Sequence, residues 1–248
     1  MRRPKKSGAL SLWMNNQRVG TWAVTAQGEH VFHYDNAWLA SPLGRPISLS
    51  MPLRPATAPY KGEAVRNYFE NLLPDNDNIR QRLAKRFSTG TEAFRLLAEI
   101  GRDCVGALQI MPEAENPPSN EAIQFELLST EQVAEHLAGT LTTPAFTQTD
   151  DTFRISIAGA QEKTALLWHN ENWCRPLGAS PTTHIFKLPM GQMPGGIDLS
   201  TSVENEWLCH TLLQAFEIPV AKAEIVQFGE MKALCVERFD RRWTANGR

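Results

Sequence analysis

The first part of the chain alternates apolar and polar residues, which is the pattern of half-buried strands. Between residues 9 and 34 this alternation is interrupted at two turn signals, Asn15-Asn16 and Gln27-Gly28. The spacing predicts a three-stranded antiparallel meander. Five prolines between positions 42 and 59 exclude long regular elements there, so loops and short edge strands are expected.

Helical spacing replaces the alternation further along the chain. Apolar residues recur every three to four positions over 64–73, 76–87 and 91–100, and these segments are predicted helices. An apolar strand is predicted at 105–111. The second helix has a basic face, which is either solvated or a surface for a partner. That face consists of Arg80, Arg82, Lys85 and Arg86.

A stretch rich in proline and glutamate separates two parts of the chain. Residues 113–120 have the composition of a linker. We therefore expect a domain boundary there, with residues 1–112 on one side and 121–248 on the other.

The second part begins with a predicted short helix at 129–137, where Ser129 and Gln132 have capping-box spacing. Two apolar runs with strand-like alternation follow at 153–157 and 164–168, joined by small residues. This arrangement predicts a hairpin with a permissive loop.

The tip of this predicted hairpin combines small residues with a lysine. Small side chains let backbone N–H groups approach a ligand, and Lys163 adds a positive charge that suits an anion such as phosphate. The alternative is an ordinary tight hairpin, because a single glycine is a weaker signal than a glycine-rich motif. The tip consists of Ala158, Gly159, Ala160 and Gln161, followed by Glu162.

A lysine interrupts the next apolar strand, which is predicted at 183–189. Lys187 needs a charge partner there, because burying an unpaired ammonium is costly. The following helix begins with capping-box spacing at Thr201 and Glu204, so the cap is expected to occupy Glu204 and to leave Glu206 for Lys187. The apolar stripe of this helix consists of Val203, Trp207, Leu208, Leu212 and Phe216. A phosphate loop, a strand lysine and a helix glutamate in this order indicate the nucleotide lobe of a protein-kinase-like fold.

A last hairpin is predicted from 223–228 and 231–236, and Glu237, Arg238 and Phe239 follow it directly. From the residues alone, Glu237 and Arg238 also fit an exposed ion pair at a strand end, which would contribute little stability.

Composition and charge narrow the functional classes. Apolar residues make up 42% and charged residues 21% of 248 residues, as in globular proteins, and the net charge of −2 does not favour direct binding of nucleic acid. No apolar stretch is long enough to span a membrane, and the N-terminus does not have the pattern of a signal peptide. The cysteines are far apart, which indicates buried free thiols in a reducing, cytoplasmic compartment. They are Cys104, Cys174, Cys209 and Cys235.

Five short motifs, in this order, carry a specific resemblance. They are WMNNQRVG at 13–20, NLLPD at 71–75, EIGRD at 99–103, IAGAQEKT at 157–164 and VERFDRR at 236–242. Together they resemble the HipA family, the serine/threonine-kinase toxins of HipBA toxin–antitoxin modules. The resemblance runs from about Leu12 to the last residue.

The resemblance implies roles for individual residues. Residues 158–163 would cover the nucleotide phosphates, Lys187 would bind them, and the backbone of residues 237–239 would form a hinge that takes the adenine edge. Ser156 matches an autophosphorylated serine, where a phosphate would repel ATP and switch the kinase off; otherwise Ser156 is only the polar member of a strand. The implied ATP-binding residues are Ala158, Gly159, Ala160, Gln161, Glu162, Lys163, Lys187, Glu237, Arg238 and Phe239.

The predicted fold class is α+β. A meander-plus-helices subdomain at 1–112 and a linker at 113–120 precede the nucleotide-binding N-lobe of a kinase-like fold at 121–248. The family kinases continue into a mostly helical lobe with the catalytic aspartate and the metal ligands, and the sequence stops before these. We therefore expect no catalytic or metal-binding residue in it, no phosphoryl transfer by it alone, and an exposed apolar surface.

The resemblance also implies ligands and partners. ATP and Mg²⁺ are expected for the intact protein, an aminoacyl-tRNA synthetase as its substrate, and growth arrest with persistence as its effect. A HipB-like helix-turn-helix antitoxin is the expected partner, with operator DNA contacted through it. The alternative is a non-catalytic module that only docks such an antitoxin. No membrane contact is expected.

Overall fold

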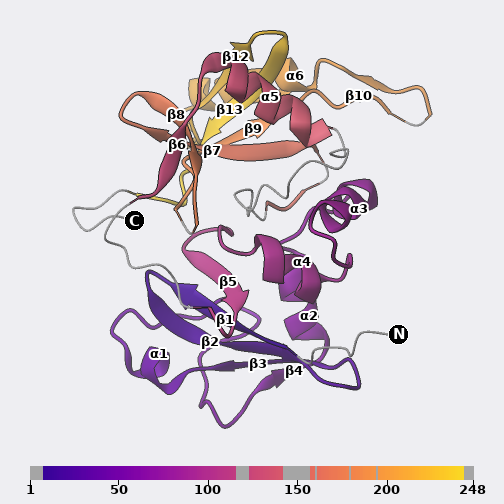
Figure 1. Cartoon of the computed structure of the whole chain (residues 1–248). Coiled ribbons are helices and arrows are strands. Elements are labelled where there is room, and N and C mark those ends of the chain that lie inside the picture. Colours follow the sequence, from indigo (N-terminus) through magenta and orange to yellow (C-terminus); the bar gives the residue numbers. More distant parts are fainter. Residues whose placement is uncertain are drawn as a thin grey trace.

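The computed structural model describes residues 8–115, 123–141, 157–159, 161–178, 180–193 and 195–242. These residues form two larger antiparallel sheets, one in each half of the sequence, and Figure 1 shows the two halves stacked with helices around each sheet. Each sheet has its own cluster of buried apolar side chains. The linker predicted at 113–120 lies largely outside the described residues, so the exact domain boundary stays a prediction.

The first sheet has five strands in the order β4-β3-β2-β1-β5. Its centre is the predicted meander, which is confirmed. Asn15 and Asn16 form the first turn with positive φ angles of 47° and 62°, a conformation that asparagine tolerates better than most residues. The strands are β1 (Ala9–Met14), β2 (Gln17–Val24), β3 (His30–Tyr34), β4 (Tyr60–Lys61) and β5 (Leu108–Pro112).

Three of the four helices beside this sheet were predicted, with ends shifted by a few residues. In the core, Trp22 stacks on Phe69 with ring centroids 3.7 Å apart. Gly101 follows the last residue of α4 at a point where β5 lies close: a Cβ there would meet the Leu97 carbonyl oxygen at 2.5 Å and the Ile110 Cβ at 2.8 Å. The helices are α1 (Asn36–Ala40), α2 (Glu63–Glu70), α3 (Asp77–Arg86) and α4 (Ala93–Ile100).

The second sheet has six strands in the order β12-β13-β9-β7-β8-β6. The predicted strands at 164–168 and 183–189 and the last hairpin are confirmed as β7, β9 and β12–β13, whereas β6 and β8 were not predicted. The hairpin partner predicted at 153–157 lies almost wholly outside the described residues. The strands are β6 (Phe125–Leu127), β7 (Lys163–His169), β8 (Asn172–Pro176), β9 (His184–Lys187), β12 (Ala223–Phe228) and β13 (Met231–Glu237), beside a small ribbon of β10 (Gly191–Gln192) and β11 (Asp198–Leu199).

One face of the second sheet is covered by α5 (Thr130–Leu141), the helix predicted at 129–137. Its capping box is present: the Ser129 backbone N–H donates to Gln132 Oε1 at 2.8 Å, and the Gln132 N–H donates to Ser129 Oγ at 3.3 Å. The core beneath α5 consists of Val133, Leu137, Leu166, Phe186, Leu188, Phe228, Ala233 and Cys235.

Helix α6 (Ser202–Ala215) differs from its prediction in two ways. Thr201 makes no side-chain capping bond, and Glu204 instead binds Lys232 of β13, so the predicted capping box is wrong. Of the predicted apolar stripe only Val203 is buried. Periodicity identifies an apolar face but not what covers it, and no described residue covers this one. The exposed members are Trp207 (40%), Leu208 (50%), Leu212 (50%) and Phe216 (75%).

The cysteines are free thiols, and three of them are buried as predicted. Cys209 of α6 is exposed, so its predicted burial is wrong. Within the described part of the chain, no helix is long and apolar enough to cross a membrane.

Candidate functional site

The two lysines singled out in the sequence lie on the same face of the second sheet. Lys163 of β7 and Lys187 of β9 are register partners. Thr164 bonds His136 of α5 at 2.9 Å, and successive residues of a strand point to opposite faces. Both lysines therefore project from the face opposite to the one that α5 covers.

Lys187 forms an ion pair with Glu206 of α6. The two side chains are 25% and 27% exposed, and His210 Nε2 lies 3.9 Å from the same carboxylate oxygen. The pair holds the ammonium at the end of β9, next to the loop that precedes β7. Although the expected occupation of Glu204 by the cap is wrong, the structure brings Lys187 and Glu206 together.

The loop before β7 is held by side chains directed to backbone groups. Lys163 Nζ donates to the Ala158 carbonyl oxygen at 2.6 Å, and Gln161 Nε2 donates to the Leu188 carbonyl oxygen at 2.7 Å. Gly159 has a φ of 113°, a conformation that L side chains rarely adopt, so this position favours glycine, and a Cβ there would also meet Lys163 Nζ. Ala160 and Ser156 lie outside the described residues.

Electrostatics favour an anion on this face. Burial lowers the pKa of the Lys163 ammonium, and the charge of Lys187 acts in the same direction, while Asp75 and Glu206 oppose it. Two ammonium groups that disfavour each other gain free energy when a polyanion lies between them. The arrangement can therefore hold a phosphate chain.

A pocket of about 570 Å³ lies beside the ion pair, within the size range of small-ligand sites. Gln161 of the loop lines one side, and Ser202, Asn205 and Glu206 of α6 line another. The pocket thus joins the loop and the helix that the sequence grouped together.

The segment 237–239 is attached to the fold in two ways: through backbone hydrogen bonds and through the buried side chain of Arg238. The backbone N–H of Glu237 donates to the Lys222 carbonyl at 2.9 Å, and that of Arg238 donates to the Thr183 carbonyl at 2.8 Å. Arg238 is 8% exposed, so the alternative of an exposed Glu237–Arg238 ion pair is wrong. Phe239 is 89% exposed. An adenine contact at this segment stays a prediction.

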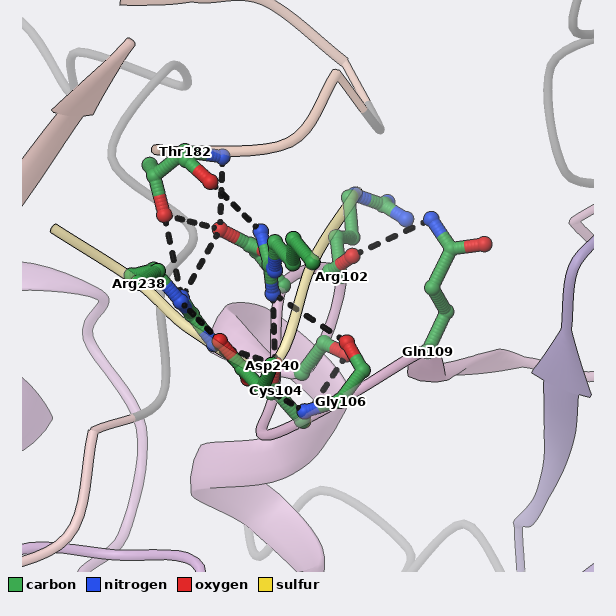
Figure 2. A network of polar contacts seen from close by, with 10 residues as sticks. Arg102, Cys104, Gly106, Gln109, Thr182, Arg238 and Asp240 are labelled. Carbon is green, nitrogen blue, oxygen red and sulfur yellow. Dashed lines mark hydrogen bonds and ion pairs between the residues drawn. The ribbon is translucent and has the colours of Figure 1, made fainter. Parts of the chain in front are cut away.

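The side chain of Arg238 points to the first half of the molecule, where a buried polar network joins the two halves (Figure 2). Arg238 donates to Thr182 Oγ1 at 3.0 Å and to the Cys104 carbonyl oxygen at 3.2 Å, and Arg241 donates to the same carbonyl at 2.7 Å. Arg241 also forms an ion pair with Asp103. The network therefore ties the turn after α4 to the end of β13.

Charge is balanced within this network. Asp103 lies 3.7 Å from Arg238 and accepts hydrogen bonds from both the backbone N–H and the hydroxyl of Thr182, at 3.2 and 2.8 Å. Asp240 binds Arg238 through both carboxylate oxygens, at 3.0 and 2.7 Å, and accepts from the Gly106 N–H at 2.6 Å. Two carboxylates thus face two guanidinium groups, which is the condition for burying such charges.

The pKa of Asp240 reflects this pairing. Burial alone would raise the pKa of this carboxyl, but the hydrogen bond and the charge of Arg238, with smaller contributions from Gly106 and Arg241, lower it to about 2. Sequence reasoning did not single out Asp103, Asp240 or Arg241, although all three lie within motifs that carried the family resemblance. The sequence does contain a signal for this network: charged residues of both signs directly follow an apolar helix, at 102–103, and an apolar strand, at 238–241.

Metal ligands do not cluster in the described part of the chain: it has no group of three or more His, Cys, Asp or Glu placed to hold a metal ion.

The fold and the site define a mixed α/β protein with two antiparallel sheets and a paired lysine beside a glycine loop. Family models match both halves: the HipA N-terminal domain matches residues 10–111, and the HipA-like C-terminal domain matches residues 155–248. The chain belongs to the HipA family.

Individual relatives agree with this assignment. The protein Y4mE of Sinorhizobium fredii is 30% identical over 253 residues, with 96% of this chain and 55% of the relative covered. The serine/threonine-protein kinase toxin HipA of Shewanella oneidensis is 27% identical over 238 residues, with 96% of this chain and 51% of the relative covered. The chain therefore spans about half the length of these relatives.

A solved structure has the same fold. It is that of the Shewanella oneidensis toxin–antitoxin system HipA, HipB and its operator DNA complex, with a TM-score of 0.67 and 27% identity. The alignment covers 96% of this chain and 52% of the solved chain.

Removing one carboxylate from the buried network is expected to be strongly destabilising. Asp103→Asn leaves two guanidinium groups facing a single carboxylate, which should lower the free energy of unfolding by about 3–5 kcal/mol. The control is Glu126→Gln, whose ion pair with Arg175 is more exposed and whose loss should cost less than about 1 kcal/mol. Urea unfolding followed by circular dichroism measures both, and equal losses would contradict the role given to Asp103.

The contribution of the Asp240 carboxylate to the free energy of unfolding should disappear in acid. Its pKa is lower in the folded protein than in the unfolded chain, so its stabilisation is fully present above pH 4 and is lost as the pH falls towards 2. The stability difference between the wild type and Asp240→Asn, about 2 kcal/mol at neutral pH, should therefore shrink over this interval. Unfolding midpoints at several pH values test this, with Glu135→Gln, at an exposed position within α5, as control. A difference that does not change with pH would refute it.

Proposed function

We propose that the chain is the nucleotide-binding part of a HipA-like serine/threonine kinase of a toxin–antitoxin module. The observation that carries the proposal is the Lys187–Glu206 ion pair beside the Gly159 loop, on the sheet face that α5 leaves open. The name of the Shewanella oneidensis relative, a serine/threonine-protein kinase toxin, supports the same activity for the family.

The residues at the phosphate end have separate roles in this proposal. Glu206 holds the Lys187 ammonium at the end of β9, so that it meets the phosphates without first having to be ordered. Lys163 exchanges its bond to the Ala158 carbonyl for a bond to a phosphate oxygen. Gly159 lets the loop backbone come close to the phosphates. Gln161 and Glu162 keep the loop on the sheet through Leu188.

The adenine end lies at residues 237–239 in this proposal. Arg238 anchors the segment through its buried side chain, which leaves the backbone beyond it at a fixed position. Pre-organised backbone groups recognise a flat base at little entropic cost.

Residues 1–248 bind ATP with Mg²⁺ in this proposal but do not transfer its phosphate by themselves. The catalytic aspartate and the metal ligands that the family resemblance implies have no match among these residues, and positioning by such groups supplies most of the catalysis in phosphoryl transfer. An aminoacyl-tRNA synthetase as the substrate of the intact protein rests on the resemblance alone. A phosphate on Ser156 would add about two negative charges two residues before Ala158 and would repel ATP.

A HipB-like antitoxin is the proposed partner. The similar solved structure is that of HipA with HipB and operator DNA, and it aligns with nearly all of this chain. The net charge of −2 does not favour direct contact with DNA, so the DNA would be held through the partner.

Nucleotide binding should depend on Lys187. The wild-type chain is expected to bind ATP·Mg²⁺ in isothermal titration calorimetry, and Lys187→Ala should weaken binding about ten- to a hundredfold, as expected for a lost charge-assisted bond to phosphate. The control is Lys61→Ala, because Lys61 is exposed on β4 of the first sheet. Unchanged affinity in Lys187→Ala, or no binding by a folded wild-type chain, would refute the proposed site.

DNA should be bound only through the partner. In a gel-shift assay with operator DNA, a HipB-like helix-turn-helix protein from the same genome should shift the DNA, and addition of the chain should shift it further. The chain alone should leave the DNA unshifted at physiological salt. A shift by the chain alone would contradict the proposed route to DNA.

A further inference from the structure

The nucleotide loop touches a part of the chain that lies far from it in sequence. Pro74 and Gly159 form an isolated parallel bridge, and the backbone N–H of Asp75 donates to the Gly159 carbonyl at 3.2 Å. Pro74 and Asp75 lie in the turn between α2 and α3, in the first half of the molecule. Gly159, the loop residue with the positive φ angle, is therefore also the residue through which the loop contacts the first half.

An ion pair reinforces this contact one turn along α3. Arg82 binds Glu162, the residue between Gln161 and Lys163. The two side chains are 24% and 23% exposed, so the pair is partly shielded from water. Gln161 and Lys163 both bond to backbone groups of the site, whereas Glu162 bonds to α3.

The turn that supports the loop is itself fixed to the helices. Arg80 donates through Nε to the Pro74 carbonyl oxygen at 2.6 Å and forms an ion pair with Glu70 of α2 at 2.6 Å. Asn76 caps α3 by accepting from the N–H groups of Asn78 and Ile79, at 2.9 and 3.4 Å. A loop of small residues has few apolar contacts to hold its shape, so such external bonds must supply its order.

We infer that Arg82 is a positioning residue for the nucleotide loop, acting through Glu162 from a helix that does not line the site. This inference rests on the proposed function and deepens it, because it makes nucleotide affinity depend on the first half of the molecule. We call the Arg82–Glu162 ion pair the brace. A loop that is already held in its bound conformation loses less entropy when a ligand binds, so removing the brace should weaken binding without removing any contact to the nucleotide.

The test compares two variants of the same helix that remove the same charge. Arg82→Ala should weaken ATP·Mg²⁺ binding about three- to tenfold in calorimetry. Lys85→Ala, at an exposed position on α3, should change it less than about twofold. An equal loss in both variants would assign the effect to the net charge of α3 and would overturn the inference, as would unchanged affinity in Arg82→Ala.

A double-mutant cycle tests the route through Glu162. If Arg82 acts through this residue, Arg82→Ala with Glu162→Gln should bind no more weakly than the worse of the two single variants, whereas additive losses would refute the route. Arg82→Lys keeps the charge and should recover part of the affinity. A role in overall folding would instead lower the unfolding midpoint, which is measured on every variant.

Hydrogen exchange separates this inference from the proposed function. Without nucleotide, amides of the peptide that contains Gly159 and Glu162 should exchange faster in Arg82→Ala than in the wild type, and should be unchanged in Lys85→Ala. If the wild type binds no nucleotide, the proposed function fails while this measurement still tests the brace. Unchanged exchange in Arg82→Ala would overturn the brace itself.

Discussion

The buried Asp103 carboxylate is the group on which the relative placement of the two sheets depends. It lies in the turn after α4 of the first half and faces both guanidinium groups of the second half, Arg238 and Arg241, and it accepts two hydrogen bonds from Thr182. Such charges are buried only where each has its partner, so the network favours the observed arrangement of the two halves over arrangements that would separate these pairs. A surface of apolar side chains alone would tolerate sliding, because hydrophobic contact is not directional.

The first half of the molecule contacts the candidate site at both of its ends. At one end Arg238 belongs to the segment proposed to take the adenine, and its side chain is fixed to the Cys104 carbonyl of the first half. At the other end the Pro74 turn and Arg82 of α3 hold the loop around Gly159. Both supports belong to the first half, so they fix the distance between the segment proposed for the base and the loop proposed for the phosphates. The first half is therefore part of the site's geometry although it supplies no residue to the predicted ligand contacts.

The sequence predicts those parts of this structure that depend on local patterns. The meander, three helices of the first half, the strands β7 and β9 and the capping box of α5 follow from periodicity and end signals, and these are present. Contacts between distant segments have no such signal. Glu204 binds Lys232, so the capping box predicted from spacing is wrong. Arg238 lies 3.7 Å from Asp103, a residue 135 positions earlier, which excludes the exposed pair with Glu237 that the residues alone also allowed. The family motifs contain Asp103 and Arg238, but a motif does not say which of its members meet.

Helix α6 is held on the second sheet mainly by ion pairs, because most of its apolar stripe is exposed. Its outer stripe is exposed and adds little to its attachment, whereas Val203 is buried and two glutamates bind the sheet, Glu204 to Lys232 and Glu206 to Lys187. Glu204 and Glu206 are two positions apart, so their side chains leave the helix in different directions, and the two ion pairs together fix its rotation as well as its distance from the sheet. The Glu206–Lys187 pair therefore has two effects: it holds α6 on the sheet, and it orients the predicted phosphate-binding lysine, whose ammonium has three N–H donors and can bond a phosphate while it keeps Glu206.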